Sequence, residues 1–306
     1  MLKVSAAGVN PLDNMITRGE VKLIVPYKLP VIGGNEVVGK IEAVGANVTQ
    51  FSVGERVFSR LPLDSIGAFA QYAAVDANAI AKVPPYLSDV QAAAIPLTAL
   101  TVMQAFELMQ VKKGNTIFIS GGTGGVGAMA IPLAKAKGLK VITNGSVENK
   151  ERVLALGVDR FIDYKTEDYT QTVANVDYVL DTLGGQETEK QMTIMKKAGQ
   201  LVSLKGMPNG AFAKRMGFTG LKRLLFSFAG RKFDKMAQKY GVTYNFIFVQ
   251  ANGAQLTEVA KLFTKLELKP SLDTVYAFSD VNAALDKVAN GRSRGKTVLD
   301  LQQGEK

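Results

Sequence analysis

The sequence predicts an α/β protein that combines a small β-barrel with a doubly wound parallel sheet. Three observations lead to this fold class. The first hundred residues contain short strands separated by turns, and from about residue 110 strands alternate with helices. A glycine-rich loop also joins the first of these strands to the helix that follows it. The length of 306 residues is enough for about two domains.

The first hundred residues contain strand-like runs with no helical periodicity to link them. These runs lie at 37–45, 55–58 and 68–75, and turn glycines such as Gly34 and Gly54 separate them. Several short strands at this spacing are typical of a small barrel.

From Asp89 the pattern changes to helices that alternate with apolar strands. Continuous apolar strands between amphipathic helices indicate a parallel sheet covered on both faces. A helix interrupted by Pro96 is expected over 89–109. Strands are then expected over 116–120, 140–143, 160–163, 176–181, 200–204 and 244–249, and helices over 126–137, 149–156 and 187–196. The remaining chain predicts helices at 254–266 and 281–290 and strands at 274–278 and 296–301.

The composition excludes several classes of chemistry. With no Cys and no His, the chain can form no disulfide, thiol nucleophile, imidazole base or metal site built on those ligands. No apolar run approaches the roughly 18 to 20 residues that span a bilayer, and the N-terminus does not resemble a signal peptide. We therefore expect a soluble, cytoplasmic protein.

The net charge of +10 is concentrated in residues 211–240, where eight Lys or Arg stand against Asp234 and hold +7 of it. This segment is also rich in Phe and Leu, so contact with a membrane, entry of a lipid-like quinone and a lid are alternatives. The sequence favours a plainer interpretation, in which amphipathic helices pack on the domain and leave a solvated basic face. Because the rest of the chain is nearly balanced, nucleic-acid binding is not expected.

The strongest chemical signal is the glycine loop within residues 117–127. Its G-x-G-x-x-G pattern follows a strand and opens a helix, as in Rossmann dinucleotide sites. The first glycine makes a tight turn, the second lets a pyrophosphate approach, and the third lets helix and strand pack closely. The helix N-terminus then offers free N–H groups to the phosphates. The predicted cofactor-binding residues here are Gly122, Thr123, Gly124, Gly125, Val126 and Gly127.

The second strand of this unit indicates which nicotinamide cofactor binds. NAD sites usually place Asp or Glu at its end to hold the ribose 2′-hydroxyl. This sequence has Gly145 and Ser146 there instead, followed by Lys150 and Arg152, which could receive a 2′-phosphate. A solvated helix face is the plainer interpretation of the two basic residues. The missing acid favours NADPH.

Several segments together resemble the zinc-independent quinone oxidoreductases of the medium-chain dehydrogenase/reductase superfamily, in family order along nearly the whole chain. They are residues 6–13, 33–39, 53–57, 67–72, 92–101, the glycine loop and 291–296. The resemblance implies a GroES-like catalytic domain, residues 1–98 completed by 250–306, and a Rossmann NADPH-binding domain, residues 99–249. It also implies a homodimer that pairs through the last Rossmann strand.

Two features depart from the family pattern. Zinc alcohol dehydrogenases of the superfamily carry a His ligand near Gly34, where this sequence has Asn35, so no metal is expected. Family members also usually have a longer segment before a strand like the one at residues 2–4. We therefore expect edge strands of the barrel to be missing or replaced.

The resemblance also implies particular site residues. It places Asn10 at the cleft between substrate and nicotinamide, Thr101 beside the nicotinamide and Tyr164 near the adenosine 2′-phosphate. A turn before a proline, an ordinary helix Thr and a core or surface Tyr are the respective alternatives. Ligands bind at the carboxyl ends of strands in such sheets. Further cofactor contacts are therefore expected from Leu183, Gly184, Lys205 and Lys296, although for Lys296 a solvated side chain is an equal alternative.

Without metal, His or Cys, the chemistry would come from the cofactor. Hydride transfer from NADPH suits acceptors that delocalise charge, namely quinones and α,β-unsaturated carbonyls. Reduction of enoyl thioesters such as acrylyl-CoA is an alternative. A non-catalytic NADPH-binding sensor is another.

Overall fold

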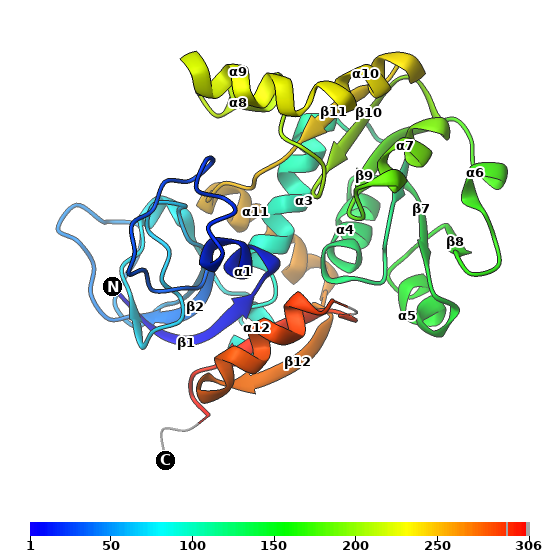
Figure 1. Ribbon diagram of the computed structural model, residues 1–306. Coiled ribbons are helices and arrows are strands. Elements are labelled where there is room, and N and C mark those ends of the chain that lie inside the picture. The colour runs from blue at the N-terminus through cyan, green and yellow to red at the C-terminus, as the bar shows by residue number, and fades with distance from the viewer. Residues whose placement is uncertain (292, 304–306) are drawn as a thin grey trace. The chain divides into compact units, whose positions relative to one another are not determined.

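The computed structural model describes residues 1–291 and 293–303 (Figure 1). The chain divides into two compact units. Unit 1 comprises Met1–Leu100 and the chain from Val249 on, and unit 2 comprises Thr101–Phe248. The sequence prediction divides the chain at residues 98 and 250. Of the resembling segment 291–296, residue 292 lies outside the described residues.

Unit 1 is built on a seven-stranded sheet in the order β12-β13-β1-β2-β3-β5, with β4 paired to β1. Strand β1 lies between β2 and β13 and is antiparallel to both, so strands from the two ends of the chain meet in one sheet. The strands are β1 Leu2–Val9, β2 Glu36–Ile41, β3 Arg56–Arg60, β4 Tyr72–Ala73, β5 Ile80–Lys82, β12 Leu272–Ala277 and β13 Lys296–Asp300. The unit has the GroES-like fold that the sequence predicts.

Helices of unit 1 flank this sheet. They are α1 Pro11–Thr17, α2 Asp89–Ala92, α11 Gly253–Leu266 and α12 Val281–Ala289. The expected strand over 68–75 is reduced to Tyr72–Ala73, because β4 pairs only with Leu2 and Lys3 of β1. The apolar core includes Val4, Ala7 and Val37, which are 5% exposed or less.

Unit 2 contains a six-stranded parallel sheet in the order β11-β10-β9-β6-β7-β8. This is the doubly wound Rossmann arrangement that the sequence predicts. The strands are β6 Thr116–Ile119, β7 Lys140–Gly145, β8 Arg160–Asp163, β9 Val176–Asp181, β10 Met195–Ser203 and β11 Thr243–Phe246. Because the strand order reverses between β6 and β9, their carboxyl ends mark the crevice where such sheets bind ligands.

The helices of unit 2 are α4 Gly125–Ala136, α5 Lys150–Leu154, α6 Tyr169–Thr172, α7 Gln186–Thr193, α8 Gly210–Arg215, α9 Gly220–Ala229 and α10 Arg231–Tyr240. Helix α7 is shorter than the expected 187–196. Met195 pairs with Val176 of β9 and so joins β10, and a register shift follows before Gln200. Strand pairing therefore overrides the helical pattern at these residues.

The apolar stretch Asp89–Met109 corrects one expectation from the sequence. It is the one helical segment of the described residues that is long and apolar enough to cross a membrane, although no such run was expected. The helix is interrupted as the sequence predicts: α2 ends at Ala92, and α3, Pro96–Met109, begins at the proline, where a missing N–H costs no helical hydrogen bond. Because 78% of its most apolar window is buried in the structure, we interpret it as a core helix.

Candidate functional site

The glycine loop of unit 2 leads from β6 into α4, with Gly124 at the N-cap. A Cβ on Gly122 would lie 2.1 Å from Thr143 Oγ1, and one on Gly127 would lie 2.4 Å from the carbonyl oxygen of Gly121. These two glycines are therefore required for packing. A Cβ on Gly124 would lie 3.5 Å from the carbonyl oxygen of Gly121, an ordinary van der Waals contact, so packing does not require a glycine there. Gly125 and Val126 form the first turn of α4, where no described side chain caps the helix.

Two side chains from neighbouring elements hold the loop in place. The backbone N–H of Gly121 donates to Asn144 Oδ1 at 2.8 Å, and Arg152 Nη2 donates to the carbonyl oxygen of Thr123 at 2.7 Å. Arg152 was considered as a phosphate ligand, but its guanidinium supports the loop. Sequence reasoning missed Asn144. Its signal is a polar side chain at the end of an apolar strand, where ligands bind.

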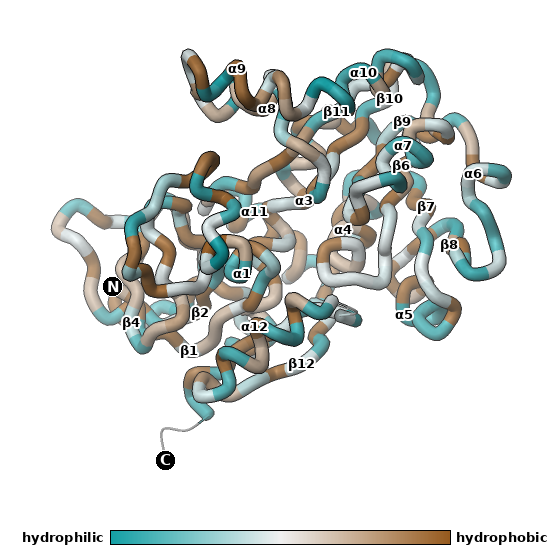
Figure 2. The backbone as a smooth tube through the Cα atoms, in the orientation of Figure 1, coloured by the Kyte–Doolittle hydropathy of each residue, from teal (hydrophilic) through white to brown (hydrophobic). Residues whose placement is uncertain are grey.

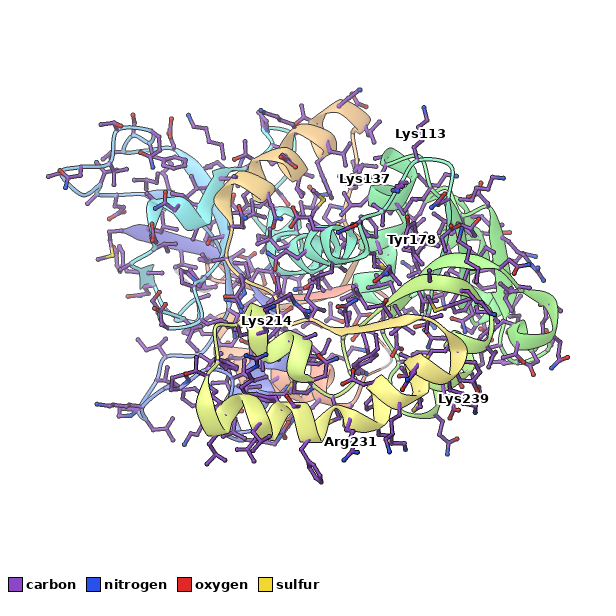
Figure 3. All side chains as sticks on the ribbon, turned by 90° about the horizontal axis from the view of Figure 1, so that it is seen from above. Lys113, Lys137, Tyr178, Lys214, Arg231 and Lys239 are labelled. Atoms are coloured by element: carbon purple, nitrogen blue, oxygen red, sulfur yellow. The ribbon has the colours of Figure 1, made fainter. Side chains whose placement is uncertain are left out.

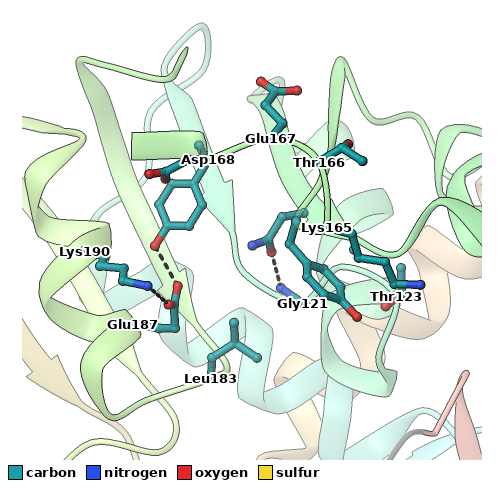
Figure 4. A pocket seen from close by; sticks show the side chains of 13 residues that line it. Gly121, Thr123, Lys165, Thr166, Glu167, Asp168, Leu183, Glu187 and Lys190 are labelled. Carbon is teal, nitrogen blue, oxygen red and sulfur yellow. Dashed lines mark hydrogen bonds and ion pairs between the residues drawn. The ribbon is translucent and has the colours of Figure 1, made fainter. Parts of the chain in front are cut away.

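A pocket of about 750 Å³ opens beside this loop, large enough for part of a dinucleotide (Figure 4). Four predicted cofactor residues, Thr123, Gly145, Tyr164 and Leu183, line it. The other lining residues are Gly121, Asn144, Lys165, Thr166, Glu167, Asp168, Tyr169, Glu187 and Lys190. The end of β7, the segment after β8 and the loop after β9 therefore meet at one pocket.

One wall of the pocket is held in place by the side chain of Tyr169 and by an ion pair between Lys190 and Glu187. The hydroxyl of Tyr169 donates to Glu187 Oε2 at 2.9 Å, and Lys190 Nζ lies 2.7 Å from Glu187 Oε1 (Figure 4). The ring of Tyr169 stacks on Phe118 of β6, with centroids 4.8 Å apart. Burial raises the pKa of Tyr169, so this hydroxyl stays protonated and acts as a donor.

Two basic residues line the pocket, Lys190, which is paired with Glu187, and Lys165, which sequence reasoning missed although it singled out Tyr164 beside it. Lys165 Nζ lies 2.9 Å from Glu148 Oε1, and hydrogen bonds from Lys165 and then Ser146 lower the pKa of Glu148 to about 2. Lys150 is exposed at the start of α5 and is not among the described lining residues.

Asp181, buried at the end of β9, organises the neighbouring strand ends. Its carboxylate accepts the backbone N–H groups of Leu183 and Gly184 at 3.0 and 2.9 Å. It also accepts hydrogen bonds from the side chains of Thr188, Gln191 and Ser203. Gly184 adopts a φ of +71°, and a Cβ there would lie 2.8 Å from Cβ of the exposed Lys205. Asp181 thus sets the backbone that brings Leu183 to the pocket.

Unit 1 contains a buried polar network around Asn10, the residue that precedes α1. Asn10 Oδ1 accepts a hydrogen bond from Lys296 Nζ at 2.6 Å, and Asn10 Nδ2 donates to Glu36 Oε2 at 3.1 Å and to the carbonyl oxygen of Gly8 at 3.3 Å. Lys296 also forms an ion pair with Glu36. Both amide hydrogens of Asn10 are thus engaged within unit 1.

Asp13 extends this network. Its carboxylate accepts the backbone N–H of Asn10 and Asn35 Nδ2, each at 2.7 Å. Burial raises the pKa of Asp13 to about 6, although these hydrogen bonds and Lys296 act to lower it. Arg60 is buried among the same charges, and burial lowers the pKa of its guanidinium to about 10. Two carboxyl groups are therefore balanced by two cations.

This network does not fit a zinc ion. The position where zinc enzymes have a His ligand is Asn35, whose Nδ2 donates to Asp13. The buried cations Lys296 and Arg60 already offset the negative charge of the Asp13 and Glu36 carboxylates. They would also repel a metal ion. Within residues 1–291 and 293–303, no three His, Cys, Asp or Glu residues gather as a metal site would require.

The roles expected for Asn10, Thr101, Ser146 and Lys296 in binding cofactor or substrate stay predictions. Asn10 and Lys296 belong to the buried network of unit 1, and Thr101 is buried in α3. Ser146 follows β7, where its Oγ accepts a hydrogen bond from Asn149 Nδ2 at 3.1 Å. The network could not be read from the sequence because Lys296 and Asn10 are 286 residues apart.

Comparison with known families finds matches in both units. Residues 1–85 match the alcohol dehydrogenase GroES-like domain, and residues 156–299 match the zinc-binding dehydrogenase family. The chain is 29% identical to the mitochondrial NAD(P)H oxidoreductase RTN4IP1 of Danio rerio over 328 residues, which cover 100% of this chain and 84% of the relative.

Solved structures of related proteins also match nearly the whole chain. An alcohol dehydrogenase superfamily protein from Novosphingobium aromaticivorans is 30% identical, with a TM-score of 0.80 over 98% of this chain and 91% of the other. The quinone oxidoreductase from Coxiella burnetii is 26% identical, with a TM-score of 0.80 over 98% of this chain and 89% of the other.

Proposed function

Since the chain belongs to the quinone oxidoreductase family of NAD(P)H oxidoreductases, within the medium-chain dehydrogenase/reductase superfamily, we propose that it transfers hydride from NADPH to a quinone or an α,β-unsaturated carbonyl. The observation that carries this proposal is the loop at the start of α4. There Gly124, a glycine that packing does not require, follows Thr123, which lines a pocket together with Tyr164 and Leu183.

The residues of unit 2 fit a dinucleotide. The N–H groups in the first turn of α4 would hold the pyrophosphate, because they have no described side-chain cap and carry the positive end of the helix dipole. Tyr164 and Leu183, 59% and 43% exposed, would pack against the adenosine half. When bound, the cofactor supplies the hydride.

The preference for NADPH rests on charge. The end of β7 carries Asn144, Gly145 and Ser146, none of which can bind a ribose diol as a carboxylate does. Lys165 lines the pocket and is an ammonium donor suited to a 2′-phosphate. Its partner Glu148 is exposed, so a phosphate can replace that carboxylate at little cost.

The residues of unit 1 suit an acceptor that needs little activation. Asn35 stands where zinc enzymes place a metal ligand, and the nearby charges neutralise one another. Quinones and α,β-unsaturated carbonyls spread the charge delivered by hydride over several atoms, so hydrogen bonds are enough to stabilise it. Asn10 and Lys296 are the proposed positioning residues, because they fix the end of β1 against β13.

The test is a steady-state assay of NADPH and NADH oxidation with benzoquinone, phenanthrenequinone, an enone and acrylyl-CoA. We expect turnover with NADPH on quinones or enones. Turnover on acrylyl-CoA alone would instead identify an enoyl-thioester reductase. Tight NADPH binding without turnover on any acceptor would identify a sensor. The homodimer and the cytoplasmic location remain predictions.

A further inference from the structure

Helix α9 presents a stripe of large apolar side chains to solvent. The stripe consists of Leu221, Leu224, Leu225 and Phe228, which are 71%, 66%, 52% and 76% exposed. Their spacing of three and four residues places them on one face of the helix. Scattered apolar side chains are ordinary on a protein surface, but four on one face mark an interaction site.

The opposite face of α9 anchors the helix to unit 2. Phe226 is 6% exposed and packs against Phe212 and Phe218, with ring centroids 5.8 and 5.5 Å away. The plainer interpretation of the sequence, in which the apolar residues pack on the domain, holds for Phe212 and Phe226 but not for the apolar stripe. The stripe is therefore available for another partner.

Helix α10 continues this surface with positive charge. Phe228 of the apolar stripe lies beside a hollow of about 600 Å³, whose other lining residues are Arg231, Lys232, Lys235, Met236 and Lys239. Figure 3 shows Arg231 and Lys239 towards the two ends of α10, and Figure 2 shows brown segments of α9 beside the largely teal α10. Lys222 and Arg223 of α9 add two further charges.

Few acids offset this charge. Asp234 is the one acid in residues 211–240, and its carboxylate accepts a hydrogen bond from Asn209 Nδ2 at 2.7 Å. Lys239 Nζ lies 3.2 Å from Glu189 Oε1 and is partly neutralised. The hollow lined by Arg231, Lys232, Lys235 and Lys239, here called the basic hollow, therefore keeps a strong positive potential next to the apolar stripe.

We propose that α9 and α10 bind the surface of an anionic lipid bilayer. The apolar stripe would enter the boundary between headgroups and acyl chains, and the basic hollow would receive lipid phosphates. An apolar helix face combined with lysines and arginines is the chemistry by which interfacial helices bind membranes. Anionic lipids attract such residues over about a Debye length.

The charges argue against two other occupants. In a symmetric dimer formed through this surface, each basic residue would approach the basic residues of the second copy and repel them. A nucleic acid would satisfy the charge but would leave the apolar stripe in water. The proposal uses no residue of the cofactor pocket and does not depend on the proposed function.

The test is a flotation assay of the full chain with vesicles of phosphatidylcholine alone or of phosphatidylcholine with phosphatidylglycerol. We expect binding to the anionic vesicles to be at least about tenfold tighter, and to weaken as salt is raised. Equal binding to both vesicle types, or no binding to either, would overturn the proposal.

Paired variants separate the two parts of the surface. Leu221→Ser with Leu224→Ser should weaken binding to anionic vesicles at least about tenfold, and so should Lys232→Glu with Lys235→Glu. The matched controls, Leu154→Ser with Leu266→Ser and Lys261→Glu with Lys265→Glu, change exposed helical residues elsewhere and should bind like the original chain. All these side chains are exposed, and an unchanged thermal melt would verify that each variant is folded.

Three results would contradict the proposal. The test variants could bind vesicles as the controls do. Light scattering could instead show a dimer that Leu221→Ser with Leu224→Ser dissociates, without vesicle binding, and the surface would then join two copies of the chain. Binding to duplex DNA in place of vesicles would assign the charge to nucleic acid.

Discussion

Lys296 Nζ lies 2.6 Å from Asn10 Oδ1, although 286 residues separate them along the chain. The same ammonium group forms an ion pair with the buried Glu36. Since β1 and β13 are neighbours in the sheet, the contact between Lys296 and Asn10, which follows β1, joins them through polar side chains as well as through the backbone. Lys296, the first residue of β13, therefore links the last strand to β1 and β2 through buried side chains.

Removal of that lysine should destabilise unit 1. Lys296→Met leaves Glu36 buried without its cation, which we expect to lower the free energy of unfolding by about 3–5 kcal/mol in urea denaturation. Adding Glu36→Gln should restore much of this loss because no unpaired charge remains. The control is Lys40→Met, at an exposed position of β2. Equal effects of Lys296→Met and Lys40→Met would contradict the prediction.

Protonation of Asp13 should make the stability of the chain depend on pH. Its pKa is raised from 3.8 to about 6 in the folded state, so the folded chain binds this proton more tightly than the unfolded chain. The resulting stabilisation is full below about pH 4 and is lost as the pH rises through 6. Relative to Asp13→Asn, the original chain should therefore lose about 3 kcal/mol between about pH 4 and 7. A difference in unfolding free energy that does not change with pH would refute this.

Substitutions of two loop glycines should have different effects: one should weaken cofactor binding and the other should lower the stability of the fold. A Cβ on Gly124 makes only an ordinary contact with the Gly121 carbonyl oxygen, so Gly124→Val should keep the melting temperature but lower NADPH affinity by about a hundredfold or more. Gly127→Val would press a Cβ against the Gly121 carbonyl and should cost about 1–3 kcal/mol of stability. Fluorescence titration and thermal melts distinguish the two. Unchanged NADPH affinity in Gly124→Val would exclude this loop as the phosphate site.

Lys165 should discriminate between the two nicotinamide cofactors. A hydrogen bond to a charged group contributes about 1.5–3 kcal/mol, so Lys165→Ala should weaken NADPH binding by roughly ten- to a hundredfold. The affinity for NADH should change little. Lys150→Ala is the matched control, since Lys150 is exposed and does not line the pocket. A larger loss of NADPH affinity in Lys150→Ala would show that the 2′-phosphate binds at Lys150, the residue that the sequence indicated.

The parallel sheet could be predicted from the sequence because its signals are local. The strand at Val176–Asp181 has an apolar centre, Tyr178–Leu180, and its predicted and observed bounds are identical. The end of α7 was predicted too late, because pairing of Met195 with Val176 depends on a residue in another strand. Predictions thus failed where a distant partner decides the conformation.

The same reasoning explains which site residues were found. The glycine loop has a motif whose spacing is set by its own turn, so its residues could be named in advance. Lys165 lines the pocket only because the segment after β8 lies beside the end of β7, where Tyr164 N donates to the Gly145 carbonyl. Sequence reasoning favoured Lys150 as the phosphate ligand instead, because Lys150 follows the end of the second strand along the chain. Asp181 was passed over because its role is to hold Leu183 and Gly184 rather than to contact a ligand.

The position of β1 between β2 and β13 has a consequence for synthesis of the chain. Unit 2 is continuous in sequence and can fold on the ribosome before residue 296 has been translated. During that interval β1 has an unpaired edge and Glu36 lacks its ammonium partner. A nascent chain can therefore carry a folded unit 2 while unit 1 is incomplete, and the unpaired edge of β1 can then pair with strands of other chains.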